Sequence, residues 1–286
     1  MIGFYVFGGG RGHLTRISRF IHQMRLDDFL IYTANPAASL YFPRSAVILF
    51  EAVDNVRETD LAQFLATEWN SYSFDDFYVD CFPFGILHEI PFESLSANRI
   101  HYLARRLKTS NYSLQELPIR FNSTFIFEPL EADHQLFVEQ NSQQICRFDF
   151  VLRKEQRIGW PSCLSPLIPY WLVLHSSEVD EVGLLLMKAL QLMERESRQI
   201  QLVLISDCCP PSYLSQVIWL KNEHNPTGYF ENAEKIFSGA GFNTMQELRN
   251  HRNKHVCLPF ERKFDDQKWR ANNNETEEKN INSSRT

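Results

Sequence analysis

Short apolar runs alternate with polar or amphipathic stretches along the first part of the chain. Four of these runs predict buried strands, over residues 2–7, 29–34, 46–51 and 75–85. Each run is followed by a polar or helical stretch, and the last one ends in a turn with proline and glycine. Strands that alternate with helices in this way predict a parallel sheet with helices on both faces.

The middle of the chain is less regular. Residues 94–108 predict a helix, and the runs 123–130 and 135–140 predict strands. A second alternating pattern begins near Tyr170, with a strand over 170–177 and another over 200–207.

Between those two strands, Ser177 and Asp180 resemble a capping box that opens a helix through about Glu196. Apolar residues at helical spacing form its core-facing stripe: Val179, Val182, Leu186, Leu190 and Met193.

These patterns predict an α/β protein with two Rossmann-like domains. The proline-rich stretch 158–169 predicts an interdomain linker, because proline continues neither helix nor strand. The N-terminal domain then covers 1–157 and the C-terminal domain 170–271. Residues 272–286 have one apolar residue in fifteen and predict a disordered tail.

Composition narrows the classes of protein. The chain has 286 residues and a formal net charge of −6, so no overall basic field favours nucleic acid as a partner. Its six cysteines are scattered without a C-x-x-C pair, which indicates buried thiols in a reducing compartment and a cytoplasmic location. The first residues predict a strand rather than a signal peptide, and no apolar run reaches the roughly 18 residues that span a bilayer. Peripheral membrane contact stays open.

Two glycine turns carry the candidate chemistry. The first, at residues 8–12, leads from a strand into His13 and an amphipathic stretch, where backbone N–H groups can approach a ligand. The second, Ser238-Gly239-Ala240-Gly241, leads into a helix that starts near Asn243 or Thr244 and offers its positive end to phosphate.

Polar residues follow the second turn. Glu247 lies one helical turn on, where its carboxylate can accept ribose hydroxyls. A strand over 255–259 then precedes Asp265, Asp266 and Gln267. An acid and an amide at the carboxyl end of a strand suit a polyhydroxylated sugar.

The order of these features resembles the donor-binding half of GT-B glycosyltransferases, closest to family 28, which includes the peptidoglycan GlcNAc transferase acting on a lipid-linked muramyl-peptide. The family pattern is matched by Ser238-Gly239-Ala240, Thr244, Glu247, Pro259-Phe260, Asp266-Gln267, Trp269 and Ala271. The first glycine turn resembles the family's first glycine loop. The match covers roughly residues 1–20 and 230–272, and Arg270 stands where the family usually has Asn.

The resemblance implies two Rossmann-like domains that face a cleft, and transfer of a sugar from a nucleotide-sugar donor, UDP-linked, to an acceptor hydroxyl with inversion. Its implied donor contacts are Gly239, Ala240, Gly241, Asn243 and Thr244 at the diphosphate, Glu247 at the ribose, and Asp266 and Gln267 at the sugar. Ser238, Ser176 and Ser177 complete this donor set. No D-x-D motif is present and no metal or other cofactor is expected, so helix and glycine amides stabilise the leaving diphosphate.

His13 is the candidate general base, since an imidazole has a pKa near neutrality. Gly10, Arg11, Gly12 and Arg16 form the candidate acceptor-side loop.

The acceptor is a lipid, a glycan or a small molecule. Four acidic residues of the first domain are candidates for its site: Asp75, Asp76, Asp80 and Glu89. Two alternatives stay open: a nucleotide-sugar epimerase on the same fold, and a catalytically weak nucleotide-sugar-binding subunit. The short sequence after the sugar motif favours the second alternative.

Overall fold

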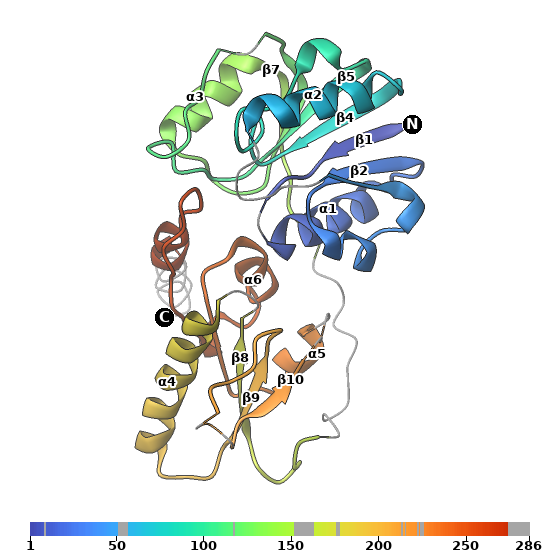
Figure 1. Cartoon of the computed structure of the whole chain (residues 1–286). Helices are drawn as coiled ribbons and strands as arrows, with labels where there is room; N and C mark the ends of the chain where they lie inside the picture. The colour runs from blue at the N-terminus through green and yellow to red at the C-terminus, as the bar shows by residue number, and fades with distance from the viewer. Residues whose placement is uncertain are drawn as a thin grey trace. The chain divides into compact units, whose positions relative to one another are not determined.

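The computed structural model describes residues 1–8, 10–50, 57–116, 118–151, 163–175, 178–212, 214, 216–221, 223 and 226–273. The chain forms two compact units (Figure 1). Unit 1 consists of Met1–Val151 together with Lys263–Asp265, and unit 2 consists of Leu152–Arg262 and Asp266–Thr286. Each unit is built around one parallel sheet.

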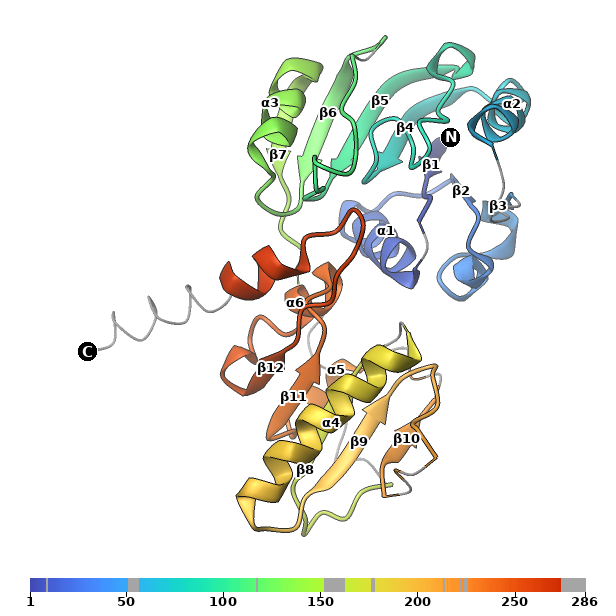
Figure 2. The same ribbon diagram turned by 60° about the vertical axis from the view of Figure 1, so that its left-hand side comes forward.

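The sheet of unit 1 has seven strands in the order β3-β2-β1-β4-β5-β6-β7 (Figure 2). All of its pairs are parallel. The strands are β1 (Ile2–Tyr5), β2 (Phe29–Thr33), β3 (Val47–Leu49), β4 (Phe74–Asp80), β5 (Ala97–Ala104), β6 (Phe121–Ile126) and β7 (Ser142–Arg147). The strand order reverses between β1 and β4, and ligands of open parallel sheets bind at such a reversal, beyond the carboxyl ends of the strands.

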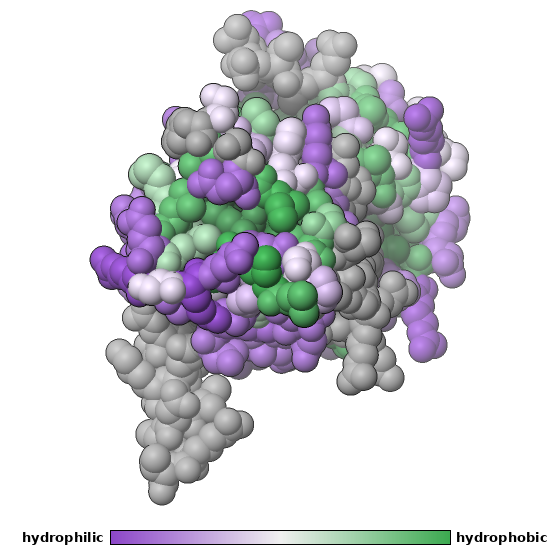
Figure 3. Space-filling view, turned by 90° about the horizontal axis from the view of Figure 1, so that it is seen from below, coloured by the Kyte–Doolittle hydropathy of each residue, from purple (hydrophilic) through white to green (hydrophobic). Residues whose placement is uncertain are grey.

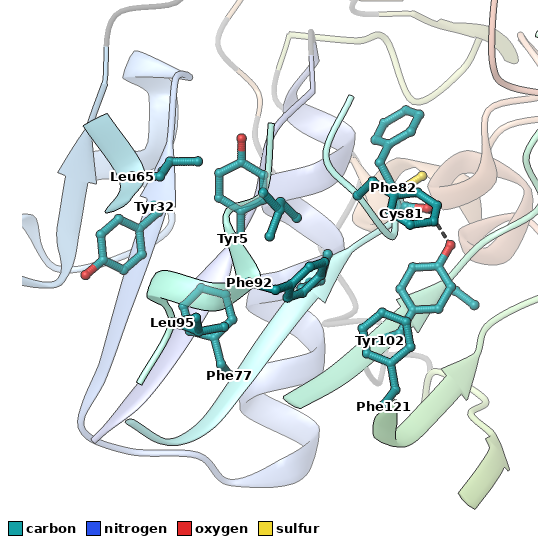
Figure 4. Close-up of a cluster of buried hydrophobic side chains, with 14 of the residues drawn as sticks. Tyr5, Tyr32, Leu65, Phe77, Cys81, Phe82, Phe92, Leu95, Tyr102 and Phe121 are labelled. Atoms are coloured by element: carbon teal, nitrogen blue, oxygen red, sulfur yellow. Dashed lines mark hydrogen bonds between the residues drawn. The ribbon is translucent and has the colours of Figure 1, made fainter. Parts of the chain in front are cut away.

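Helices cover both faces of this sheet. On one face, α2 (Glu58–Trp69) and α3 (Ala132–Asn141) bury Trp69 and Phe137 in one cluster. Figure 4 shows Tyr5 and Phe77 of the same cluster. On the other face, α1 (Arg11–Met24) places Phe20 against Phe4, Tyr78 and Phe125. Side chains of one strand alternate between the two faces, so a doubly covered strand is apolar nearly throughout.

Unit 2 repeats this plan with five parallel strands in the order β10-β9-β8-β11-β12. They are β8 (Tyr170–Leu174), β9 (Gln201–Ile205), β10 (Ile218–Leu220), β11 (Lys235–Ser238) and β12 (His255–Cys257). The helices are α4 (Val179–Glu196), α5 (Thr227–Phe230) and α6 (Phe242–Glu247). Here the order reverses between β8 and β11.

Both faces of the second sheet are buried as well. Helix α4 places Leu185 and Leu186 against Trp171 and Phe237. The opposite face carries a separate cluster that includes Phe230 of α5. Within the predicted stripe of α4, Val182 and Leu186 are buried, whereas Val179 is 51% exposed because it is the first residue of the helix.

Two secondary-structure predictions are wrong. The helix predicted over 94–108 is largely strand β5, because pairing with β4 and β6 outweighs local helix propensity. In β5 the side chains alternate: His101 stacks on Tyr78, and Tyr102 turns to the other face and donates to the Cys81 carbonyl at 2.7 Å.

The strand predicted over 135–140 lies inside helix α3. Its buried residues are His134, Phe137 and Val138, which have helical rather than alternating spacing. His134 is completely buried, so the core-facing side of this helix begins before the run 135–140.

Some predicted segments fall partly outside the described residues. Of the linker predicted over 158–169, residues 163–169 are described, and Gln201 holds them through bonds to Ser165 and Ile168. Of the tail predicted over 272–286, Asn272 and Asn273 are helical and the rest lies outside the described residues. All six cysteines are unpaired, but Cys163 and Cys209 are exposed, so the expectation of six buried thiols is wrong.

The prediction of an α/β fold with parallel sheets is confirmed. Among the described residues, no helix has the length and apolar character needed to cross a bilayer. Hydrophobic and hydrophilic residues are both present on the face shown in Figure 3.

Two leucines of α4 provide a stability test of this packing. Leu186→Ala should lower the free energy of unfolding by about 2–5 kcal/mol, because Leu186 is fully buried between helix and sheet. Leu184→Ala should change it by less than about 0.5 kcal/mol, since Leu184 is 47% exposed. Urea unfolding followed by tryptophan fluorescence measures both, and equal losses would contradict the assigned orientation of α4.

Candidate functional site

The site in unit 1 lies where the strand order reverses. Helix α1 begins at Arg11, directly after the glycine turn that follows β1, and therefore carries His13 in its first turn. Asp80 is the last residue of β4. Since β1 and β4 are adjacent and parallel, the turn after β1 and the end of β4 meet at one edge of the sheet.

His13, Asp80 and Arg16 form a compact hydrogen-bonded group. His13 Nδ1 lies 2.6 Å from Asp80 Oδ2. Arg16 donates to the same carboxylate from Nε at 3.1 Å and from Nη2 at 2.8 and 2.7 Å. Because a carboxylate only accepts, Nδ1 of His13 donates in the bond to Asp80, which leaves Nε2 as the nitrogen that can take up a proton. Arg16 Nη2 also lies 3.0 Å from the same Nδ1.

Burial and charge set the protonation states of this group. Burial lowers the pKa of His13, and the bond to Asp80 offsets this only in part. Burial would raise the pKa of Asp80, but the charge of Arg16 and the bond from His13 hold that pKa below its usual range. At neutral pH the group therefore contains a neutral imidazole and an ion pair whose side chains are each 1% exposed.

The glycine turn makes room for the imidazole. A Cβ at Gly8 would lie 2.3 Å from Nε2 of His13, so this position must be glycine for the ring to lie where it does. The ring of Phe82 faces the imidazole with centroids 6.2 Å apart. Of the candidate acceptor-side loop, Gly10 and Gly12 are exposed and Arg11 is half-buried, whereas Arg16 is buried against Asp80.

The four acidic candidates for the acceptor site separate into three places. Asp75 and Asp76 lie at the start of β4, about 17 and about 13 Å along the strand from Asp80. Asp75 binds the N-terminal ammonium, and Asp76 binds Arg99 and His101.

Glu89 is buried elsewhere in unit 1, where it accepts hydrogen bonds from Tyr5 and from the Leu87 amide. Of the four candidates, the described contacts bring only Asp80 to His13.

In unit 2, the second glycine turn follows β11, and side chains from later in the chain bind its backbone. Gln267 Oε1 accepts from the amides of Ala240 at 3.1 Å and Phe260 at 3.0 Å. Arg270 donates to the Ala240 carbonyl at 2.7 Å. Both polar groups of the Ala240 backbone are thus bound by buried side chains.

The remaining predicted donor residues lie around this turn. Ser238 is completely buried, its hydroxyl contacts His255 Nε2 and the Gly239 carbonyl, and its own carbonyl accepts from the Leu258 amide at 2.9 Å. This predicted donor residue therefore has partners within the protein for its hydroxyl and its carbonyl. A Cβ added at Gly239 would lie 3.1 Å from the Phe260 ring, whereas a Cβ at Gly241 would meet nothing closer than 3.9 Å.

Helix α6 begins after Gly241. Its residues Asn243, Thr244 and Glu247 are half-buried, and Asp266 caps the backbone amide of Trp269 through Oδ1 at 3.0 Å. Ser176 and Ser177 lie outside the described residues.

A second histidine group lies beyond the carboxyl end of β8 and was missed in the sequence. His175 Nε2 is 2.7 Å from Glu181 Oε2, and Arg262 forms a two-pronged ion pair with the same carboxylate. Burial lowers the pKa of His175, with a partial offset from Glu181. The ring of Phe260 lies 5.1 Å from that of His175 and also touches the position of Gly239, so this group adjoins the glycine turn.

Among the residues that the structure describes, no three His, Cys, Asp or Glu side chains are grouped so as to hold a metal ion. The polar groups at the two sheet edges are instead histidine–carboxylate–arginine sets.

No family model and no curated protein matches the chain. Among solved structures, the glycotransferase of kitacinnamycin aligns over 92% of this chain and 81% of its own, with 12% identity and a TM-score of 0.57. The UDP-N-acetylglucosamine 2-epimerase from Rickettsia bellii aligns over 91% and 79%, with 11% identity and a TM-score of 0.54. Arabidopsis thaliana UGT89C1 complexed with quercetin aligns over 91% and 79%, with 10% identity and a TM-score of 0.51. At these identities the similarity shows the fold, and the predicted GT-B type of α/β fold is confirmed.

The buried ion pair gives a second stability test. Asp80→Asn should lower the free energy of unfolding by about 3–5 kcal/mol, because it leaves the Arg16 charge buried without its counter-ion. Asp60→Asn removes the exposed pair with Arg57 and should have little effect. Chemical denaturation at pH 7 compares the two variants, and a neutral effect of Asp80→Asn would mean that water reaches Arg16.

Proposed function

We propose that the protein is a glycosyltransferase that moves a sugar from a nucleotide-sugar donor to an acceptor hydroxyl. The observation that carries this proposal is the neutral His13, oriented by Asp80 at the point of strand-order reversal in unit 1. Unit 2 binds the donor through the residues that resemble the family 28 motif. The acceptor is a lipid, a glycan or a small molecule, and the protein acts in the cytoplasm with peripheral membrane contact where the acceptor is lipid-linked.

His13 is the general base in this reaction. Its Nε2 takes the proton of the acceptor hydroxyl as the oxygen bonds to the anomeric carbon. The bond from that carbon to the diphosphate breaks, and the diphosphate leaves with the electron pair. Attack from the face opposite the diphosphate inverts the anomeric centre. Asp80 fixes the tautomer of His13 and stabilises the imidazolium that forms.

The donor diphosphate binds at the Gly239–Gly241 turn. Met245 makes the first bond of α6, to the Gly241 carbonyl, so the amides before it are directed out of the helix. Glu247 accepts from the ribose, and Asp266 binds the sugar. Gln267 acts on the sugar and also fixes the turn, since its Oε1 binds the Ala240 and Phe260 amides. The reaction proceeds without a metal, and UDP is the proposed nucleotide.

An epimerase is the second candidate, favoured by the structural similarity to the Rickettsia bellii enzyme. Incubation with UDP-sugars and an acceptor library separates the candidates by their products. A glycosylated acceptor together with UDP supports transfer, and an altered nucleotide-sugar supports epimerisation. Donor binding without turnover supports the binding-subunit alternative.

His13→Ala should lower kcat for transfer by about 10²–10⁴-fold, the usual contribution of a general base. Donor affinity should stay nearly unchanged, because the proposed donor residues belong to unit 2. The acid limb of the pH–rate profile, which reports protonation of this base, should disappear in the variant. Steady-state kinetics and calorimetry provide the measurements, and loss of donor binding with normal turnover would assign His13 a structural role.

Gly241→Leu tests the donor site. A Cβ at this position would meet nothing closer than Thr244 Oγ1 at 3.9 Å, and its φ of −63° and ψ of 142° suit any residue, so we expect the fold to be kept. The added side chain should occupy the space of the diphosphate and lower affinity for both UDP and the UDP-sugar by at least about tenfold. Calorimetry measures both ligands, and unchanged affinities with an unchanged melting temperature would move the donor away from this turn.

A further inference from the structure

Residues Lys263–Asp265 are part of unit 1, although the residues on either side of them in the chain belong to unit 2. A backbone bridge and a side-chain hydrogen bond hold this segment on the stretch after β5. The Lys108 amide donates to the Phe264 carbonyl at 2.9 Å, and Leu107 and Asp265 form an antiparallel bridge. Asn111 Nδ2 donates to the Lys263 carbonyl at 2.7 Å. The segment is therefore docked by its backbone, and its side chains have defined places.

Phe264 covers the aromatic ring that faces His13. Phe82 follows Cys81 just beyond the end of β4 (Figure 4) and is only 4% exposed. Its ring meets Phe264 edge-on with centroids 5.3 Å apart, and it faces the His13 imidazole at 6.2 Å. Tyr112 also packs edge-on against Phe264, at 6.1 Å. Phe264, Phe82 and His13 therefore form a continuous series of ring contacts.

Asp265 forms an ion pair with Arg105, whose charge acts on His13. Arg105, the first residue after β5, places Nη2 3.0 Å from Asp265 Oδ1, and the two side chains are 11% and 15% exposed. The charge of Arg105 lowers the pKa of His13. The charges of Arg105 and Asp265 also act in opposite directions on the pKa of Cys81, the residue after Asp80.

We propose that Asp265 and Phe264 are positioning residues for His13: Asp265 neutralises and fixes Arg105, and Phe264 holds Phe82 against the imidazole. The assignment rests on the proposed function only in that His13 is the base. Neither residue touches a reacting atom in this scheme, because each acts through a neighbour of His13.

Three charged groups act on the His13 imidazole from the elements packed around it. Arg16 comes from its own helix, Asp80 from the end of β4 and Arg105 from the end of β5. Cys81 stays neutral, since burial raises the pKa of its thiol to about 11. Changing the Arg105–Asp265 pair therefore changes one contribution to the pKa of His13, that of the Arg105 charge, and leaves the Arg16–Asp80 pair intact.

The experiment follows the His13 imidazole by NMR titration of the full chain, with the His13 signal assigned from its absence in His13→Gln. Asp265→Asn keeps the side-chain shape and the bridge to Leu107 but removes the nearer acidic partner of Arg105. Glu128 Oε1 remains, 3.9 Å from Arg105 Nε, so His13 is exposed to more of the Arg105 charge. The imidazolium becomes less favourable, so the pKa of His13 should fall and the acid limb of the pH–rate profile should move to lower pH. Arg105→Gln should move both in the opposite direction.

The double variant Asp265→Asn with Arg105→Gln removes the whole pair and should return the titration of His13 close to that of the unmodified protein. A residue with a purely structural role would not be rescued by deleting its partner. Glu261→Gln, which removes one exposed acidic charge from the same loop, is the matched control and should leave His13 unchanged. Phe264→Leu should keep the rate, and Phe264→Ser should lower kcat by about 10–100-fold through a displaced base.

Unchanged titration of His13 in both Asp265→Asn and Arg105→Gln would overturn the proposal, and Arg105→Gln decides it alone if Asp265→Asn does not fold. The NMR measurement needs no substrate. A protein without transferase activity whose His13 responds as described would refute the proposed function and retain the positioning role. An active protein whose His13 does not respond would refute the positioning role and retain the proposed function.

Discussion

The buried pair of Arg16 and Asp80 is the interaction on which the candidate site depends. Removing each ion from water costs several kcal/mol, and attraction at short range with three hydrogen bonds offsets that cost only when the geometry is good. The pair therefore restricts how α1 can lie against the end of β4. His13 lies one helical turn before Arg16 and receives its position and its tautomer from the same carboxylate. One carboxylate thus connects the packing of the helix with the state of the imidazole.

The parallel strand order explains why such a group forms at this edge of the sheet. Connections in a parallel sheet return the chain to the same end, so the residues that follow each strand gather at one edge, and a reversal of strand order separates the connections on its two sides. Unit 1 places His13 and Asp80 at its reversal, and unit 2 places His175 and the Gly239–Gly241 turn at the corresponding point. In both units a histidine after the first strand binds a carboxylate that an arginine also binds.

The sequence predicted the α/β class, the strands at the two glycine turns and His13 at the start of a helix, because these follow from local periodicity and glycine. It did not predict that Asp80, rather than Asp75 or Asp76, meets His13. That choice depends on which end of β4 lies at the reversal and on β1 being its neighbour, and both are properties of the whole sheet. The same limit hid the pairing of Arg105 with Asp265, whose positions are 160 residues apart in the chain. Strand β5 was misassigned because its pairing with β4 and β6 is a property of the whole sheet. Helix α3 was misassigned because its buried residues His134, Phe137 and Val138 follow a helical period that begins before the run 135–140.

The second glycine turn shows how a motif read as a ligand contact can also have a supporting role. Gln267 and Arg270 bind the amide and the carbonyl of Ala240, and both side chains are 6% exposed. A buried polar group without a partner costs about 1–3 kcal/mol, so these bonds fix the turn whether or not a ligand is bound. The backbone of the turn is consequently preorganised, and a ligand does not have to order it on binding. Arg270 reaches the Ala240 carbonyl from the helix that follows Asp266, so the segment after the turn supplies both of the bonds that hold it.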